Sequence, residues 1–314
     1  MVVESLLLLT ILFTAEPNLS PIAPIESTDL DQGSFALEIG GQIYDWDVLA
    51  RFVMPGESLR IKIIRKNLKG NFGWACSGGE LLPVDPFEKV WVAPQESGFY
   101  PLMIMNRSIK TINLFVMKSF QNLQRGRLNQ YSIGYYPKSP SPHPKLKTPE
   151  GFIEATAENE STRLSPNFVL KDFICRQPGG FPKYLVLKEE LILKLELLQE
   201  KIRDKGYPCS KLFVFSGYRT PRYNTGGGAG RHSAHIYGGA ADLFVDEDHD
   251  SLIDDLNHDG RHNSRDSKIL FDIANELDME RPDIVGGLGW YRRVSGVGPC
   301  IHIDVRGKST RWRQ

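Results

Sequence analysis

The stretch that decides the fold is SAHIYGGAADLF at residues 233–244, together with CIHIDV at residues 300–305. The first stretch ends in a short apolar run that is typical of a buried strand. The second alternates apolar and polar residues, so a strand there would show His302 and its alternate neighbours on one face. Small residues between His235 and Asp242 let the backbone turn tightly. A loop histidine and polar side chains from two strands can therefore meet at one point.

Two imidazoles and one carboxylate form a ligand set that zinc takes in catalytic sites, where a fourth position is left for water. We therefore predict a zinc site at His235, Asp242 and His302. Spacing alone leaves a structural alternative open, in which His235 lies in a surface loop, Asp242 caps a turn and His302 is a core residue. Cys300 lies on the same predicted strand face, as a soft additional ligand or as a small buried side chain.

Two further motifs stand in a fixed order around these stretches. SGYRTPRYN at residues 216–224 precedes the first, and GWY at residues 289–291 precedes the second. In this order, over roughly residues 164–314, the sequence resembles the M15 family of zinc D-Ala-D-Ala peptidases. The resemblance implies an α+β domain with a small antiparallel sheet and helices, zinc on the three residues named above, and Arg219 facing the substrate. An arginine fork pairs well with a carboxylate or an oxyanion, and a structural salt bridge is the alternative.

The sequence departs from the family pattern at the catalytic base. Many members carry a Glu three residues before the last zinc histidine, or a His two residues before it, but here Pro299 and Cys300 occupy these positions. The nearest carboxylate is Asp304, which we predict to be either the general base or a residue that orients His302. His232 is either an alternative proton shuttle or an ordinary loop residue.

A second candidate metal site lies in DLNHDGRHNSRD at residues 255–266. Oxygen-bearing side chains stand at positions 1, 3, 5, 9 and 12 of a calcium loop, and a glycine stands at position 6. The candidate calcium ligands are Asp255, Asn257, Asp259 and Asp266. The last ligand is shorter than the usual Glu, and a polar surface loop is the alternative.

Residues 30–118 are predicted to form an all-β domain. Short runs of strand composition are separated by turn signals that contain Gly-Gly or Pro-Gly pairs. Their regular spacing indicates a small β-sandwich of immunoglobulin type, with Trp74 and Trp91 in its core. Nothing in this stretch resembles a reaction centre, so we expect the domain to position or anchor the second one.

Residues 119–163 are predicted to be a Pro-rich linker. YPKSPSPHP at residues 136–144 contains four prolines, which favour an extended and semi-stiff chain. His143 in this run is not expected to be a metal ligand. Basic residues precede the run, namely Lys118, Arg125 and Arg127. We expect them to form a solvated face or to contact an anionic envelope.

The charge balance gives no indication of a nucleic-acid partner, and the N-terminal residues indicate the cellular compartment. Lys+Arg and Asp+Glu are both 38 in 314 residues, so the net charge is zero and nothing indicates a nucleic-acid partner. The apolar run at 5–13 is too short to span a bilayer, and a polar, Pro-containing stretch follows it. Residues 1–25 therefore resemble a signal segment. A buried strand is the alternative. The four cysteines lack CxxC spacing, which argues against a cysteine zinc cluster, and Cys175 and Cys209 could pair in an exported protein.

The sequence therefore predicts an exported zinc peptidase of the periplasm or cell envelope, with no stable membrane span. Its expected substrates are peptidoglycan stem peptides or cross-links. The main alternative is a non-catalytic zinc-containing module that binds the cell wall or a partner. A phage-derived lysin is a third hypothesis.

Overall fold

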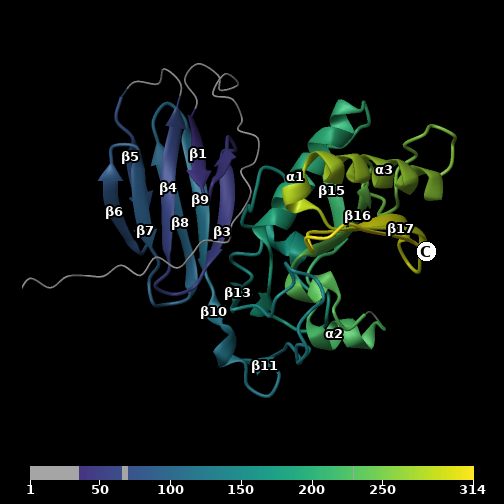
Figure 1. Ribbon diagram of the computed structural model, residues 1–314, viewed down its shortest axis with the longest axis horizontal. Helices are drawn as coiled ribbons and strands as arrows, with labels where there is room; N and C mark the ends of the chain where they lie inside the picture. The colour runs from purple at the N-terminus through teal and green to yellow at the C-terminus, as the bar shows by residue number, and fades with distance from the viewer. Residues whose placement is uncertain (1–34, 66–69, 229) are drawn as a thin grey trace, which may run out of the picture.

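The structure is a computed structural model that describes residues 35–65, 70–228 and 230–314. The predicted signal segment at residues 1–25 lies outside these ranges. A β-rich part comes first and a part with sheets and helices follows, and the two lie side by side (Figure 1). No helix in the described ranges is both long and apolar enough to cross a membrane.

The first part consists of two β-sheets that share one core. One sheet has the order β2-β1-β4-β7-β6, built from β1 (Phe35–Ile39), β2 (Gln42–Tyr44), β4 (Ser58–Arg65), β6 (Glu80–Asp85) and β7 (Glu88–Val92). The other has the order β3-β9-β8-β5, built from β3 (Val48–Val53), β5 (Gly73–Cys76), β8 (Gly98–Met105) and β9 (Ile109–Val116). Trp91 is fully buried between them, and Trp74 packs partly buried against the same cluster. The predicted all-β character is confirmed, whereas the immunoglobulin type stays a prediction.

The first part docks onto the second through β3. Arg51 on this strand is buried, and its guanidinium forms an ion pair with Glu189 at 3.2 Å. The same carboxylate accepts a hydrogen bond from the Phe52 backbone N–H at 3.0 Å. Glu189 is the first residue of α1 (Glu189–Asp204), where a negative charge also complements the helix dipole. This carboxylate joins the two parts beside an apolar contact, in which Ala50 and Phe115 belong to the core cluster of the second part.

The second part is organised around a five-stranded sheet in the order β15-β16-β18-β17-β19. The strands are β15 (Leu212–Ser216), β16 (Ala240–Val245), β17 (Gly287–Val294), β18 (Gly298–Asp304) and β19 (Thr310–Arg313). All neighbours are antiparallel except β17 and β19, which are parallel. The small antiparallel sheet expected for the second domain is therefore present, with one parallel edge strand.

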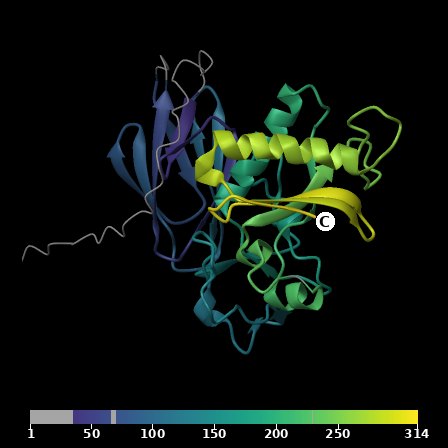
Figure 2. The ribbon, with the colours of Figure 1, turned by 45° about the vertical axis from the view of Figure 1, so that its right-hand side comes forward.

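The helices α1 and α3 (Ser264–Glu280) supply the apolar layer of this sheet, and Figure 2 shows α3 running along the sheet. Their leucines and isoleucines lie in one buried cluster with Leu243, Ile301 and Ile303. Side chains alternate along a strand, so Asp242 and His302 point to the opposite face. The remaining short elements are α2 (Pro221–Gly226), η1 (Phe120–Asn122), η2 (Leu170–Phe173), η3 (Ala234–Tyr237) and η4 (Pro282–Ile284).

The segment 119–163, for which we expected an extended linker, is instead folded onto the second part. The strands β10 (Lys118–Ser119), β13 (Gly151–Ala155) and β14 (Lys183–Leu185) form one small sheet, and β11 (Arg127–Leu128) pairs with β12 (Tyr131–Ser132). Buried apolar residues of the segment share a cluster with η3. In the Pro-rich run, Tyr136 is buried, and its hydroxyl lies 3.1 Å from that of Tyr218. The apolar residues beside the prolines supply the buried surface that holds the segment in place.

The cysteines are free thiols. Cys175 and Cys209, for which a disulfide was left open, are both buried and unpaired with each other. Cys300 is also a buried free thiol. They act here as small apolar side chains of the core.

Candidate metal centre

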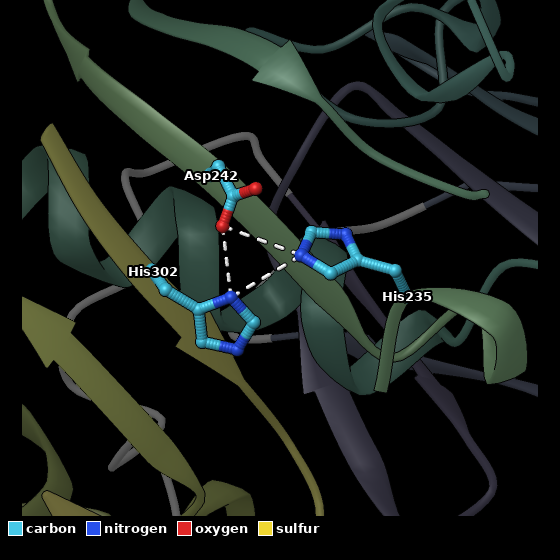
Figure 3. A group of neighbouring side chains, drawn as sticks. All are labelled: His235, Asp242 and His302. Atoms are coloured by element: carbon cyan, nitrogen blue, oxygen red, sulfur yellow. Dashed lines mark hydrogen bonds and ion pairs between the residues drawn. The ribbon is translucent and has the colours of Figure 1, made fainter. Parts of the chain in front are cut away.

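The structure brings His235, Asp242 and His302 together, as Figure 3 shows. His235 Nε2 lies 3.2 Å from His302 Nδ1 and 3.3 Å from Asp242 Oδ1. The third side of the triangle, from His302 Nδ1 to Asp242 Oδ1, measures 2.8 Å. All three residues are buried. Three atoms that can each donate a lone pair therefore face one small space.

Local backbone geometry explains the meeting. Asp242 on β16 stands directly opposite His302 on β18 in the antiparallel register. His235 arrives from η3, and the chain then turns into β16 through Gly238 at a φ of 66°. A Cβ at Gly238 would lie 2.3 Å from the Val186 carbonyl oxygen, so only glycine permits this turn. The run of small residues thus has the role that the sequence suggested.

The second nitrogen of each ring fixes which nitrogen carries the proton. His235 Nδ1 lies 2.7 Å from the Gly217 carbonyl oxygen, and His302 Nε2 lies 3.0 Å from Asp304 Oδ2. Both partners can only accept, so both of these nitrogens are the N–H donors. The lone pairs are then on His235 Nε2 and His302 Nδ1, which face each other and a carboxylate oxygen. Neutral imidazoles oriented in this way are typical metal ligands.

The pKa shifts of Asp242 and His302 indicate that a positive charge is favoured within this cluster. Burial favours neutral groups, but the two histidines outweigh it and hold the pKa of Asp242 well below its ordinary range. Burial likewise disfavours the charged ring of His302, yet hydrogen bonds to Asp242 and Asp304 raise its pKa above the ordinary value. At His235 burial dominates and lowers the pKa. The three facing acceptors therefore favour a positive charge among them, which a proton on His302 or a bound metal ion can supply.

The spacing of the three atoms fits zinc. Zinc–nitrogen bonds of about 2.0–2.1 Å at tetrahedral angles separate neighbouring ligands by about 3.3 Å. The observed sides of 2.8, 3.2 and 3.3 Å are close to that separation. Three protein ligands also leave one tetrahedral position open, which is the arrangement of catalytic sites. The residues present therefore fit a zinc ion.

Asp304 lies behind the His302 ring, on the side away from the triangle. It is fully buried, and it accepts hydrogen bonds from His302 Nε2 at 3.0 Å and from the Gly287 N–H at 2.7 Å. Arg306 Nε also donates to both of its oxygens, at 3.0 and 2.8 Å. Burial opposes ionisation, but His302 and Arg306 outweigh it and hold the pKa of Asp304 far below its usual range. Of the two predicted roles, this geometry fits the orienter rather than the general base.

Arg219 lies against the candidate metal ligands. Its Nη2 pairs with Asp242 Oδ2, and its Nε donates to Ser216 Oγ at 2.8 Å. Its backbone N–H also donates to the His235 carbonyl at 3.3 Å. The structural salt bridge is therefore present. In the described part of the chain, its Nη1 has no hydrogen-bond partner and could meet a substrate.

The other candidate residues near the centre, Cys300 and His232, lie outside the group of converging ligand atoms. Cys300 is buried, which raises the pKa of its thiol, and it does not belong to the converging group. His232 lies with its Nδ1 2.9 Å from the Tyr237 hydroxyl, and the two rings stack. The Pro-rich run also approaches the centre, because His143 Nε2 lies 3.4 Å from Arg306 Nη1.

The candidate calcium ligands accept hydrogen bonds from groups within the loop. Asp255 accepts from the N–H groups of Asp259 and Gly260, at 3.1 and 2.7 Å. Asp266 is fully buried and accepts from the N–H groups of Asn257 and Asn263, at 3.2 and 2.8 Å. Their carboxylates do not converge as a group of ligands in the ranges that the structure describes. Instead the preceding acids gather, namely Asp246, Asp248 and Asp250. Calcium binding at 255–266 stays a prediction.

Three residues of the centre were missed from the sequence. The Gly217 carbonyl sets the proton position on His235, and nothing in the sequence signals a backbone acceptor. Arg306 pairs with Asp304, and its spacing of two residues was a usable signal. Trp312 lies with its ring centroid 5.0 Å from the His302 ring, where a Cβ on Gly289 would collide with it.

Comparisons with known proteins agree with this site. A family model described as Peptidase M15 matches residues 166–264, which include His235 and Asp242 but end before His302. No curated protein matches the chain. Two solved structures, the M1 domain from titin and the Dscam1 Ig7 domain (isoform 5), share 12% and 13% identity. Each match covers 27% of this chain, and 93% and 97% of the other chains, with TM-scores of 0.18, too low to support an argument. The family match is the informative one: the C-terminal half of the chain contains a peptidase domain of the M15 family.

Proposed function

We propose that the chain is a zinc-dependent metallopeptidase that hydrolyses peptidoglycan stem peptides or cross-links in the cell envelope. One observation carries the proposal. Two neutral imidazole nitrogens and a carboxylate oxygen converge at 2.8–3.3 Å inside a peptidase domain. This set is suited to zinc and leaves one position open.

Each residue of the centre then has a defined task. His235, Asp242 and His302 hold the metal, and zinc bound there supplies Lewis-acid chemistry to peptide hydrolysis. Asp304 keeps the proton on His302 Nε2 and so keeps the Nδ1 lone pair available. Arg219 holds Asp242 in its ionised, oriented form. Its Nη1 is left for a substrate carboxylate or an oxyanion.

The rest of the chain supports this activity. The proposed export would place the enzyme beside its cell-wall substrate. The first part, of proposed immunoglobulin type, is held against α1 by the ion pair of Arg51 and Glu189. We infer that it positions the peptidase domain on the wall.

Digestion of purified cell walls tests the proposal. Zinc-loaded protein and its His302→Ala variant are incubated with purified sacculi, and released peptides are identified by mass spectrometry. Peptide release by the wild type alone supports the proposal and identifies the bond that is cut. Retained hydrolysis by a variant that holds no metal would refute this mechanism.

A second candidate is a zinc-containing module that binds the wall without cutting it. Its support is the lack of an evident base, because Pro299 and Cys300 occupy the family's usual positions and Asp304 is committed to His302 and Arg306. Sedimentation of the protein with sacculi, without any peptide release, would favour this module over the enzyme.

A further inference from the structure

A basic pocket lies between the β11–β12 hairpin and α2, outside the metal centre. It is widely open to solvent, and its volume is about 520 Å³. Arg125, Arg127 and Arg222 line it, together with the hydroxyl groups of Ser132 and Thr225. No acidic residue lines it. Figure 1 shows β11 and α2 side by side at one end of the molecule.

Close backbone packing builds this pocket. The Arg222 N–H donates to the Ile133 carbonyl at 3.0 Å, which joins the start of α2 to the hairpin. A Cβ on Gly134 would lie 2.7 Å from Arg222 N, so this approach requires glycine. Gly126 closes the other side, because its carbonyl accepts from the N–H groups of Ile133 and Gly134, both at 2.9 Å. The three arginines are thus brought together by a fixed scaffold.

The positive charge in the pocket is not neutralised by the protein. Within the described ranges, no carboxylate forms an ion pair with any of the three arginines. Arg222 Nη1 donates only to Ser132 Oγ at 3.1 Å, and Arg127 Nη1 only to the Gln130 carbonyl at 3.1 Å. These acceptors are uncharged. Three uncompensated guanidinium groups around one pocket attract an anion, and their forked donors suit a carboxylate.

The pocket is also close to the metal centre along the chain. Arg222 follows Arg219 by three residues, so their Cα atoms are at most about 11 Å apart. Arg219 pairs with the metal ligand Asp242. Tyr135, whose surface is 75% exposed, stands at the rim of the pocket and offers an aromatic face. The pocket and the metal centre are therefore joined by a short stretch of chain.

We propose that this pocket is a subsite for a carboxylate of the peptide substrate, remote from the bond that is cut. The inference rests on the proposed peptidase function and extends it, because it assigns the substrate class: acidic peptides are preferred to their amidated counterparts. Arg125, Arg127 and Arg222 select by charge, whereas the metal centre performs the reaction. The recognition residues lie partly in the segment before residue 166, outside the part that matches the family model.

A pair of peptides tests the subsite. One is a synthetic stem pentapeptide with free internal carboxylates, and the other carries amides in their place. Binding is measured by fluorescence anisotropy on the full chain with His302→Ala, which prevents turnover. Cleavage by the zinc-loaded chain gives kcat and KM separately. The test variant is Arg125→Gln/Arg222→Gln, with Arg125→Lys/Arg222→Lys to restore charge. The control is Arg107→Gln, an exposed arginine of the first part.

We expect the acidic peptide to bind about tenfold more tightly than the amidated one, as a few solvent-exposed charge pairs allow. The glutamine variant should lose this preference through KM, with kcat unchanged. The lysine variant should keep most of the preference, and the control should keep all of it. Melting curves check that each variant is folded.

Two failures can be told apart. Cleavage of both peptides with equal KM, unaffected by the glutamine variant, would overturn the subsite and leave the peptidase function standing. Selective binding of the acidic peptide without cleavage would overturn the peptidase function and leave the subsite. Equal binding of both peptides would also overturn the subsite.

Discussion

The metal centre and the loop at residues 255–266 both present side chains that can bind metals, but they use their lone pairs differently. At the centre, the outer nitrogen of each histidine is bonded to Gly217 or Asp304, so the inner nitrogens are left facing Asp242. In the loop, Asp255 and Asp266 accept hydrogen bonds from the loop's own backbone, and Asp259 accepts one from the Arg265 side chain. The centre thus directs three lone pairs at one space, whereas the loop's carboxylates, within the described ranges, are held by donors of the loop and do not converge on one point.

The orientation of the side chains, and not only their type and spacing, therefore decides whether a motif can bind a metal ion. Residue types and spacing predicted both sites equally well. Hydrogen-bond partners on the far side of each ligand separate them, because a ligand must be oriented with its lone pair unoccupied. The changes below test that distinction, starting with the largest expected effect.

His302→Ala should abolish metal binding at the centre. It removes one of three ligands and leaves the buried Asp304 without its ring partner, so we expect zinc content to fall from about one per chain to near zero. Peptide hydrolysis should fall more than about 100-fold, since a lost ligand costs more than a lost orienting partner. Metal analysis of purified protein and a peptide-release assay measure the two effects. Stoichiometric zinc in this variant would contradict the assignment.

Asp304→Asn tests whether Asp304 orients His302 or acts as a general base. It keeps the size of the side chain and removes only its charge. We expect zinc affinity to weaken about 10- to 100-fold, the usual cost of losing an orienting partner. A competition titration with a chromophoric chelator measures this. A general base would instead show a normal zinc affinity and a large loss of kcat.

Asp278→Asn is the matched control for that variant. Asp278 is also buried and also pairs with two basic residues, Lys194 at 2.5 Å and Arg311 at 2.8 Å, but it touches no metal ligand. Its loss should destabilise the fold by about 3 kcal/mol, as for other broken buried ion pairs. Zinc affinity should be unchanged. Lys194 also donates to the Asp304 carbonyl at 2.9 Å, so a parallel loss of affinity would mean that the effect at Asp304 reflects the stability of this shared network and not the orientation of His302.

The ligands of the centre could be predicted from sequence because they stand in short patterns with unusual spacing. His235, Asp242 and His302 converge as expected, and the strand alternation around His302 gave the correct face. The role of Asp304 was left open, because a sequence cannot tell which side of a ring a carboxylate approaches. That depends on Arg306 and the Gly287 N–H, which hold Asp304 behind the ring.

The path of residues 119–163 could not be predicted for a different reason. Prolines there favour an extended chain, but the run bends and turns as it packs on the second part. Whether apolar neighbours such as Leu128 and Phe152 find a partner depends on η3, more than 80 residues away along the chain. The path of the segment therefore depends on tertiary packing, which local composition does not specify. The same packing creates the basic pocket between the hairpin and α2.

The pH dependence of zinc binding separates the two roles of Asp304 a second time. The carboxylates of Asp242 and Asp304 raise the pKa of His302, so protons compete with the metal from a pH above the ordinary histidine value. Below that raised pKa, apparent affinity should fall about tenfold per pH unit. In the metal-free protein the same proton stabilises the fold, and that contribution is lost as the pH rises through the raised pKa.

Asp304→Asn should move this acid limb to lower pH, because it removes one of the charges that raise the pKa of His302. The variant thus binds zinc more weakly at neutral pH but loses it later on acidification. Zinc titrations between about pH 5 and 8 measure the shift. An unchanged limb would show that Asp304 does not act on His302.

Asp266→Ala tests the second half of the comparison and should have the smallest effect. Asp266 accepts from the Asn263 N–H at 2.8 Å and, with Asn263, forms the capping box that begins α3. Losing such a cap costs about 1–2 kcal/mol of unfolding free energy. The carboxylates of the loop do not converge within the described ranges, so we expect the same loss in about 1 mM calcium, a concentration that would fill a weak site, as in chelator. A calcium-dependent rise in the wild-type melting temperature that vanishes in this variant would instead make the loop a second metal site, and the convergence of ligand atoms would no longer distinguish the two regions.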